Sequence, residues 1–170
     1  GKNGLLKGDF ALSNNDLNSF SSVGNSDNQG IAARLSYQHR INLKEQSVLI
    51  DSNKTIKNRT DLVLTGHYEF LQDRFDVIEP YRPREFQRDW NTDFNEKTNE
   101  HLFRASIGLQ NNSWGNLNYE FGGLLKESLY TGLKHALSAN VKLGGLSIKS
   151  VASVLSAETV SYTHLRAHET

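Results

Sequence analysis

The sequence predicts an all-β fold in which long antiparallel strands follow one another as a meander. Every odd-numbered residue of the stretch 31–43 is apolar or aromatic, and the intervening residues are mostly polar. Such a period of two indicates a strand with one dry and one wet face, because successive side chains leave opposite sides of the pleat. The stretch is also long, since strands of globular proteins usually have about 5–6 residues. Both prolines, Pro80 and Pro83, fall outside every expected strand, as proline in a sheet is confined to edges and loops.

The same alternation places the other elements in order. The expected strands cover residues 5–13, 31–43, 61–70, 101–109, 117–125 and 133–143, followed by a last strand that begins at Leu146. Residues 14–30 and 44–60 are rich in polar and turn-forming residues, so both are expected to be polar connections, with 48–50 as the only candidate for a short strand inside the second. A third long connection, 74–100, is charged and carries both prolines. Three long connections are thus expected first and three short ones afterwards. Because barrels alternate short turns with long loops, either an extra strand lies within 44–60 or 74–100, or the fold is not a simple barrel.

Two short connections also predict the register of their hairpins. A turn closed around Ser113 places three apolar pairs on one side of the sheet, namely Leu109 with Leu117, Ile107 with Tyr119, and Ala105 with Phe121. Gly144-Gly145 accepts the positive φ angles of a two-residue hairpin turn and pairs Leu143 with Leu146 and Val141 with Ile148. Both hairpins therefore have one consistently apolar face, as strands with a single dry side require.

The two ends of the sequence carry no fold information of their own. The sequence starts at Gly1 and holds no Met, so residues 1–159 are expected to be an internal fragment of one β-barrel-like domain. Residues 160–170 (VSYTHLRAHET) resemble the in-frame translation of a sequencing-library adaptor. We therefore expect a non-native tail there and set it aside.

Composition excludes several classes of function. Lys and Arg total 19, as do Asp and Glu, so the zero net charge gives no electrostatic footprint for nucleic acid. The absence of Cys excludes disulfides and thiolate metal sites. No apolar run approaches the ~18 residues of a membrane helix, whereas a membrane β-barrel is compatible with the sequence because its signal per strand is much weaker.

The charged connection holds the densest group of candidate site residues. The side chains that could contact a polar or anionic ligand there are Arg74, Arg82, Arg84, Arg88, Glu85, Asp89 and Trp90. Guanidinium groups can bind a phosphate or carboxylate in bidentate fashion. The alternation of these arginines with Asp76, Glu79, Glu85 and Asp89 leaves no net anion-attracting field, so the favoured interpretation is an ion-pair network that shapes the loop.

No catalytic, cofactor-binding or metal-binding residues are expected. The spacing of Glu69, Asp73, Glu120 and Glu127 selects no pair of carboxylates for glycoside chemistry. The histidines outside the tail have no second ligand at i+2 or i+4, so no metal site is expected. We therefore expect neither an enzyme nor a bound cofactor.

The remaining question is what covers the apolar faces of the strands. If lipid covers them, the chain is part of a transmembrane β-barrel. The candidate membrane- or core-facing aromatics are then Tyr37, Tyr68, Phe70, Tyr119 and Phe121, and the residues expected on a wet inner face are Arg34, Gln38, Arg40, Lys142 and Lys149.

A resemblance supports the membrane interpretation. The run from Tyr68 through Phe75 to Glu85-Phe86 and Arg88-Asp89-Trp90, with ALSNNDLNSFSS at 11–22, resembles large outer-membrane-associated β-rich proteins of Bacteroidota-type bacteria. The resemblance covers most of residues 5–155. It implies a location in the outer membrane or cell envelope of a Gram-negative bacterium, and it carries over no catalytic residues.

Two alternatives remain open from the sequence. A second sheet could cover the dry faces, as in a secreted β-sandwich that binds carbohydrate or mediates adhesion, although sandwich strands are usually shorter. The sheet could also fold into a periplasmic trough whose apolar interior carries lipid. The expected partners of the favoured barrel are outer-membrane lipid, the rest of the same protein and an unidentified envelope protein.

Overall fold

The computed structural model describes residues 4–15, 29–51, 54–77, 82–83, 85–92, 97–127 and 129–159, with only the backbone described for 48–51 and 54–57. The tail 160–170 and Arg84 lie outside these ranges.

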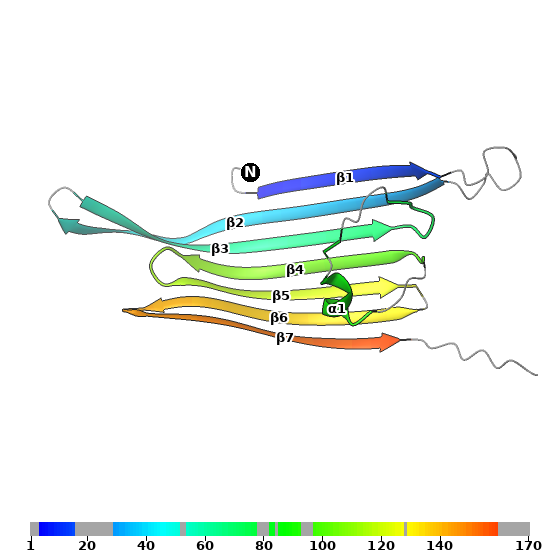
Figure 1. Cartoon of the computed structure of the whole chain (residues 1–170). Coiled ribbons are helices and arrows are strands. Elements are labelled where there is room, and N and C mark those ends of the chain that lie inside the picture. The colour runs from blue at the N-terminus through cyan, green and yellow to red at the C-terminus, as the bar shows by residue number, and fades with distance from the viewer. Residues whose placement is uncertain are drawn as a thin grey trace, which may run out of the picture.

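The fold is a single open antiparallel sheet of seven strands in the order β1-β2-β3-β4-β5-β6-β7 (Figure 1). The strands are β1 (Gly4–Asn14), β2 (Gln29–Asp51), β3 (Lys54–Leu71), β4 (Glu100–Asn111), β5 (Gly115–Lys126), β6 (Tyr130–Leu143) and β7 (Leu146–Thr159), and one short helix, α1 (Phe86–Trp90), lies between β3 and β4. Each strand pairs with the next along the chain, so β1 and β7 are the two edges. The predicted all-β meander is confirmed.

Both predicted hairpin registers are confirmed. Leu109 pairs with Leu117 and Ile107 with Tyr119 across the β4–β5 turn, and Val141 pairs with Ile148 across the turn at Gly144-Gly145. Gly144 has a φ of +60°, the left-handed conformation for which glycine is suited at a primed turn.

The prediction of a polar connection over 44–60 is wrong. The pairing of β2 with β3 continues past a bulge between Asn42 and Lys44 and reaches Asp51 opposite Lys54. This hairpin extends beyond the rest of the sheet (Figure 1), because β1 pairs with β2 only up to His39 and β4 pairs with β3 only up to Thr60. The extension lacks the alternation of 31–43 because it lies outside the part of the sheet that has one uncharged face.

The corrected hairpin also changes the arrangement of the connections. The connections β2–β3, β4–β5 and β6–β7 are all tight and share one end of the sheet, whereas the long connections β1–β2 and β3–β4 share the opposite end (Figure 1). The expected series of three long connections followed by three short ones is therefore wrong. The β5–β6 connection, between Lys126 and Tyr130, is also short but lies at the end of the long connections. Transmembrane β-barrels typically have short turns at one end and longer loops at the other, so the arrangement agrees with theirs at the end of the tight turns and in two of the three connections at the other end.

One face of the sheet has no charged side chain over most of its extent. This uncharged face is formed by the even-numbered residues of 6–12, 62–70 and 146–156 and the odd-numbered residues of 31–41, 101–109, 117–125 and 131–143, as the cross-strand pairs show. None of these positions is Lys, Arg, Asp or Glu. The next residue of β7 on the same face, Glu158, does carry a charge. The charged residues of the strands gather on the opposite polar face, which includes Arg34, Gln38, Arg40, Lys142 and Lys149.

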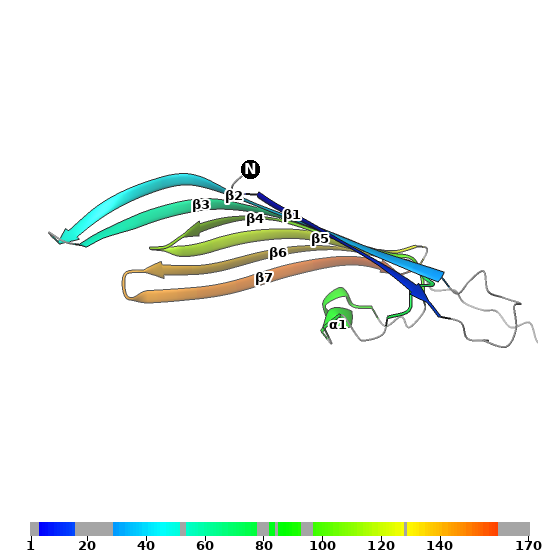
Figure 2. The same ribbon diagram turned by 90° about the horizontal axis from the view of Figure 1, so that it is seen from above.

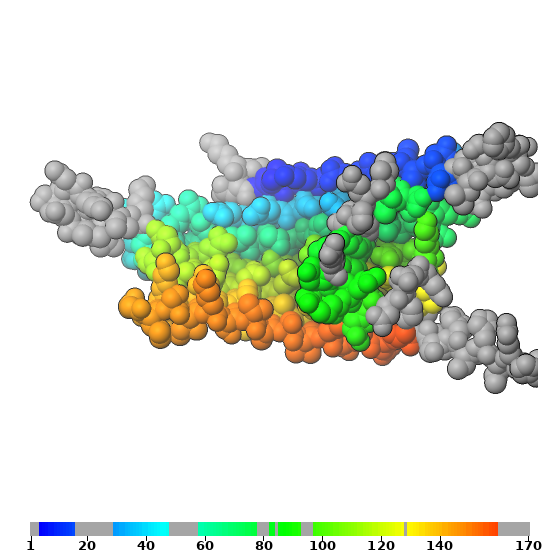
Figure 3. Space-filling view, in the orientation of Figure 1, coloured from blue at the N-terminus to red at the C-terminus, as the bar shows by residue number. Residues whose placement is uncertain are grey.

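The two faces are covered very differently. Large side chains of the uncharged face are exposed, for example Phe10 (66%), Leu12 (72%) and Leu137 (47%). The main buried cluster lies on the polar face instead, where α1 packs over β4–β6 (Figure 3). The strands bow away from α1, so the helix lies on the concave side of the sheet (Figure 2).

Candidate functional site

The helix α1 is held on the polar face by a small apolar core. Trp90 packs with Leu102, Leu124, Leu129 and Tyr130, all of them buried. The Tyr130 hydroxyl donates a hydrogen bond to the main-chain carbonyl of Trp90. This core fixes the α1 end of the connection between β3 and β4 to the middle strands of the sheet.

A glycine on the polar face makes room for one of these aromatic rings. A Cβ on Gly132 would lie 2.4 Å from the Tyr130 hydroxyl oxygen, and a Cβ on Gly122 would lie 3.5 Å from the Trp90 ring. The Tyr130 ring therefore lies directly over the backbone of Gly132, an approach that only glycine allows, whereas a Cβ at 122 would make ordinary van der Waals contact with the Trp90 ring.

Buried ion pairs hold the other end of the helical segment. A terminal nitrogen of Arg82, Nη2, lies 3.0 Å from a carboxylate oxygen of Glu69 and 2.8 Å from one of Glu100. Arg34 also pairs with Glu69 at 3.2 Å, and Lys126 with Glu100 at 2.8 Å. These partners, Glu69, Glu100 and Lys126, are largely buried side chains of the sheet. Arg82 therefore links the connection between β3 and β4 to both of those strands.

The start of the same connection is fixed to the edge strand. The Asp76 carboxylate accepts hydrogen bonds from Asn15 and from Lys97, the latter at 3.0 Å. The main-chain N–H of Asp76 donates to the Ser13 hydroxyl at 3.0 Å. The hydrogen bond and charge of Lys97 lower the pKa of Asp76 below its ordinary value.

The structure brings together only some of the predicted loop residues. Arg82, Asp89 and Trp90 line one hollow between α1 and the sheet. Arg74, Glu85 and Arg88 are exposed and lie outside it. Of the local ion pairs expected within the loop, the described residues show Arg88 with Asp89 at 3.9 Å. Arg82 pairs instead with Glu69 and Glu100 of the strands, and neither had been assigned to the network from the sequence.

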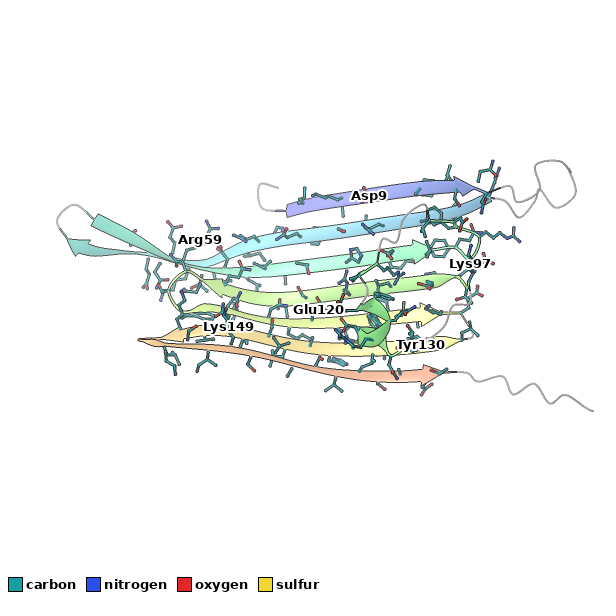
Figure 4. All side chains as sticks on the ribbon, in the orientation of Figure 1. Asp9, Arg59, Lys97, Glu120, Tyr130 and Lys149 are labelled. Carbon is teal, nitrogen blue, oxygen red and sulfur yellow. The ribbon has the colours of Figure 1, made fainter. Side chains whose placement is uncertain are left out.

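This polar hollow has a volume of about 350 Å³. Beyond the loop residues, its charged or titratable lining comes from the polar face of the sheet, namely Arg34, His67, Glu69, Arg104, Glu120 and Lys134. Figure 4 shows Glu120 beside α1. A second, larger and mainly apolar hollow of about 690 Å³ lies between β1–β3 and residues 75–77, with Phe75 and Val77 among its lining.

All five predicted aromatics lie on the uncharged face. They form two equivalent clusters with histidines of the neighbouring strands. Tyr68 and Phe70 flank His101, and Tyr119 and Phe121 flank His135, with hydroxyl-to-Nδ1 distances of 2.8 and 2.7 Å and Phe–His ring centroids 5.0 Å apart in each cluster. Tyr37 stacks on His39 with ring centroids 6.2 Å apart.

A repeated tripeptide underlies both clusters and was missed in the sequence. Tyr-Glu-Phe occurs at 68–70 and again at 119–121. In each copy the Tyr and Phe belong to the uncharged face and the central glutamate, Glu69 or Glu120, lines the polar hollow. The identical tripeptides at matching strand positions are the signal that could have revealed it.

The described part of the chain shows no group of three or more His, Asp or Glu side chains that could hold a metal ion. Within the same residues, no helix has the length and apolar character needed to cross a membrane. Comparisons with models of protein families, with curated proteins and with solved structures gave no match.

Proposed function

We propose that the chain forms part of the wall of a transmembrane β-barrel in the outer membrane of a Gram-negative bacterium, with a structural or transport role and no catalytic site. The uncharged face would contact lipid, and the polar face would line the interior. The strands that complete the barrel would come from the rest of the same protein.

The observation that carries this proposal is that the face left uncovered is the one without charge. Soluble monomers rarely expose contiguous apolar patches larger than a few hundred Å². Here the patch runs across all seven strands, while the small buried core and nearly all charged residues are on the opposite side. Lipid is the environment in which an uncharged, exposed sheet face is stable.

Strand length fits the same environment. The uncharged stretch of β4 runs from His101 to Leu109, and a barrel strand crosses the hydrocarbon region with about 9–11 residues when tilted. The outward faces of such barrels carry aromatic girdles near the membrane surfaces, a role that suits the clusters around His101 and His135.

The curvature of the sheet favours a barrel over the two alternatives. In a lipid-carrying trough the apolar face would be the concave one, whereas here α1, which packs on the polar face, lies on the concave side (Figure 2). In a sandwich a second sheet would cover the apolar face, and the described residues form one sheet only.

Paired cysteine substitutions test the proposal, because the chain has no native Cys. Ser106→Cys and Ile107→Cys lie next to each other on β4 and point to the polar and the uncharged face respectively. With the protein in lipid vesicles, we expect a fluorophore at 107 to be quenched by a nitroxide-labelled lipid and one at 106 by aqueous iodide.

A second pair, Asn118→Cys and Tyr119→Cys on β5, should give the same alternation. Equal quenching by iodide at 107 and 119 as at 106 and 118 would contradict the proposal. So would a full chain that is monodisperse in buffer without detergent.

A further inference from the structure

Two opposite charges in the polar hollow have no partner within the described chain. Arg104 of β4 and Glu120 of β5 both line the hollow, and neither makes a hydrogen bond or ion pair with another described residue. Other charges of the lining are engaged, since Arg34 and Arg82 pair with Glu69, and Lys134 lies 3.8 Å from Asp89.

The sheet register places these two charges close together. Glu120 is the cross-strand partner of Ser106 and Arg104 is that of Gly122, so Arg104 and Glu120 are diagonal neighbours about 7–8 Å apart at the backbone. The Arg104 stem leans over β5, because its Cγ lies 3.2 Å from the position of a Cβ on Gly122. A ligand that contacts both groups must therefore be compact.

We propose that the polar hollow binds a small zwitterion in which a carboxylate and an ammonium group lie close together, as in an α-amino acid. The Arg104 guanidinium would donate two hydrogen bonds to the ligand carboxylate, and the Glu120 carboxylate would accept hydrogen bonds from its ammonium group. The volume of about 350 Å³ lies within the range of small-molecule pockets. A simple anion would be repelled by Glu120 and a simple amine by Arg104.

The site is independent of the proposed membrane wall, because its strand residues all belong to the polar face. Its occupant would be a candidate for what the protein binds or passes. Failure of the lipid-quenching experiment would leave the binding test intact, and the reverse also holds.

Trp90 provides a direct reporter of binding. The chain has two tryptophans, and Trp114 lies in the β4–β5 turn at the end of the sheet opposite α1. The full chain with Trp114→Phe therefore has one tryptophan, in the wall of the hollow. Its fluorescence would be followed during titration with glycine, acetate or methylammonium, with calorimetry as a second measurement.

We expect saturable binding of glycine at concentrations where acetate and methylammonium give none. Arg104→Gln and Glu120→Gln should each weaken glycine binding at least tenfold. Lys149→Gln is the matched control, since Lys149 is a charged residue of the polar face at the end of the sheet far from α1 (Figure 4). The affinity of this variant for glycine should equal that of the parent protein.

Each of the following results would overturn the proposal: no saturable response to glycine, equal binding in the Arg104→Gln and Lys149→Gln variants, or acetate binding as tightly as glycine. The charge-swapped double variant, Arg104→Glu with Glu120→Arg, guards against loss of binding through misfolding. We expect it to recover glycine binding that either single swap loses, and a folded double variant that does not bind would also count against the proposal.

Discussion

At the scale of single residues, the hydroxyl of Tyr130 is the hydrogen-bond donor that joins the sheet to α1. The side chain is almost fully buried, and its hydroxyl donates a hydrogen bond to the carbonyl of Trp90. Tyr130→Phe leaves that buried carbonyl without this donor, so we expect a loss of about 1–3 kcal/mol in the free energy of unfolding.

Denaturant unfolding of the full chain measures this loss. Tyr119→Phe is the control, because its hydroxyl bonds to His135 on the exposed uncharged face. Tyr119→Phe should lower the free energy of unfolding clearly less than Tyr130→Phe does. Equal losses would show that burial of the hydrogen bond to Trp90 adds little to the stability of the fold.

The pair formed by Asp76 and Lys97 gives a prediction about pH. The folded-state pKa of Asp76 lies below the ordinary value of 3.8, chiefly because Lys97 donates a hydrogen bond to the carboxylate. The interaction therefore stabilises the fold at pH values above 3.8 and is lost as the pH falls through the folded-state pKa.

Lys97→Gln should raise the pKa of Asp76 towards 3.8. Titration of the Asp76 carboxyl carbon by NMR measures the shift. Lys7→Gln serves as the control, since Lys7 has no ion pair in the described chain and its removal should leave the Asp76 titration unchanged.

At the scale of elements, the connection between β3 and β4 depends on Arg82. Its replacement in Arg82→Met removes a cation from two largely buried carboxylates, Glu69 and Glu100, although Arg34 and Lys126 still pair with them. We expect α1 to separate from the sheet more often, because a buried carboxylate that loses a partner favours contact with water.

Hydrogen exchange measured along the chain would detect this separation. Amides of α1 should exchange at least tenfold faster in Arg82→Met, with little change in β4. Arg88→Met is the matched control on the helix itself, because the Arg88 side chain is 77% exposed and 3.9 Å from its nearest carboxylate. Equal exchange in the two variants would contradict an anchoring role for Arg82.

The elements also show what sequence reasoning can and cannot reach. The two hairpins were predictable because one apolar face and a short turn together allow only one register. The extension of β2 and β3 over 44–60 was not, since strands outside the one-sided part of the sheet need no alternation. Docking of α1 was missed for another reason: Arg82 meets Glu69 and Glu100 only after the chain has folded.

At the scale of the whole molecule, the alternating residues do form one uncharged and one polar face as predicted, but the location of the core was not foreseen. The buried cluster around Trp90 lies on the polar face, where charged residues had suggested a wet surface. Gly132 creates the space for the Tyr130 ring, and such a fit between a ring and the backbone has no periodic signature in the sequence.

The environment of the uncharged face decides whether one substitution, Leu137→Arg, is harmful or nearly neutral to the protein. Leu137 is 47% exposed on that face. If lipid surrounds it, Leu137→Arg should impair insertion of the full chain into vesicles and cost about 2–4 kcal/mol near the bilayer midplane. If water surrounds it, the same change removes an exposed apolar side chain and should improve solubility at almost no cost in stability.

The neighbouring residue supplies the control for this last prediction. Ala136 lies on the polar face, across from Glu120, so an arginine there acquires a nearby carboxylate and stays away from lipid. Ala136→Arg should therefore insert into vesicles as the parent does, while Leu137→Arg should not. Because the two positions are adjacent in β6, a difference between them must come from the face to which each side chain points, and not from strand propensity or from net charge.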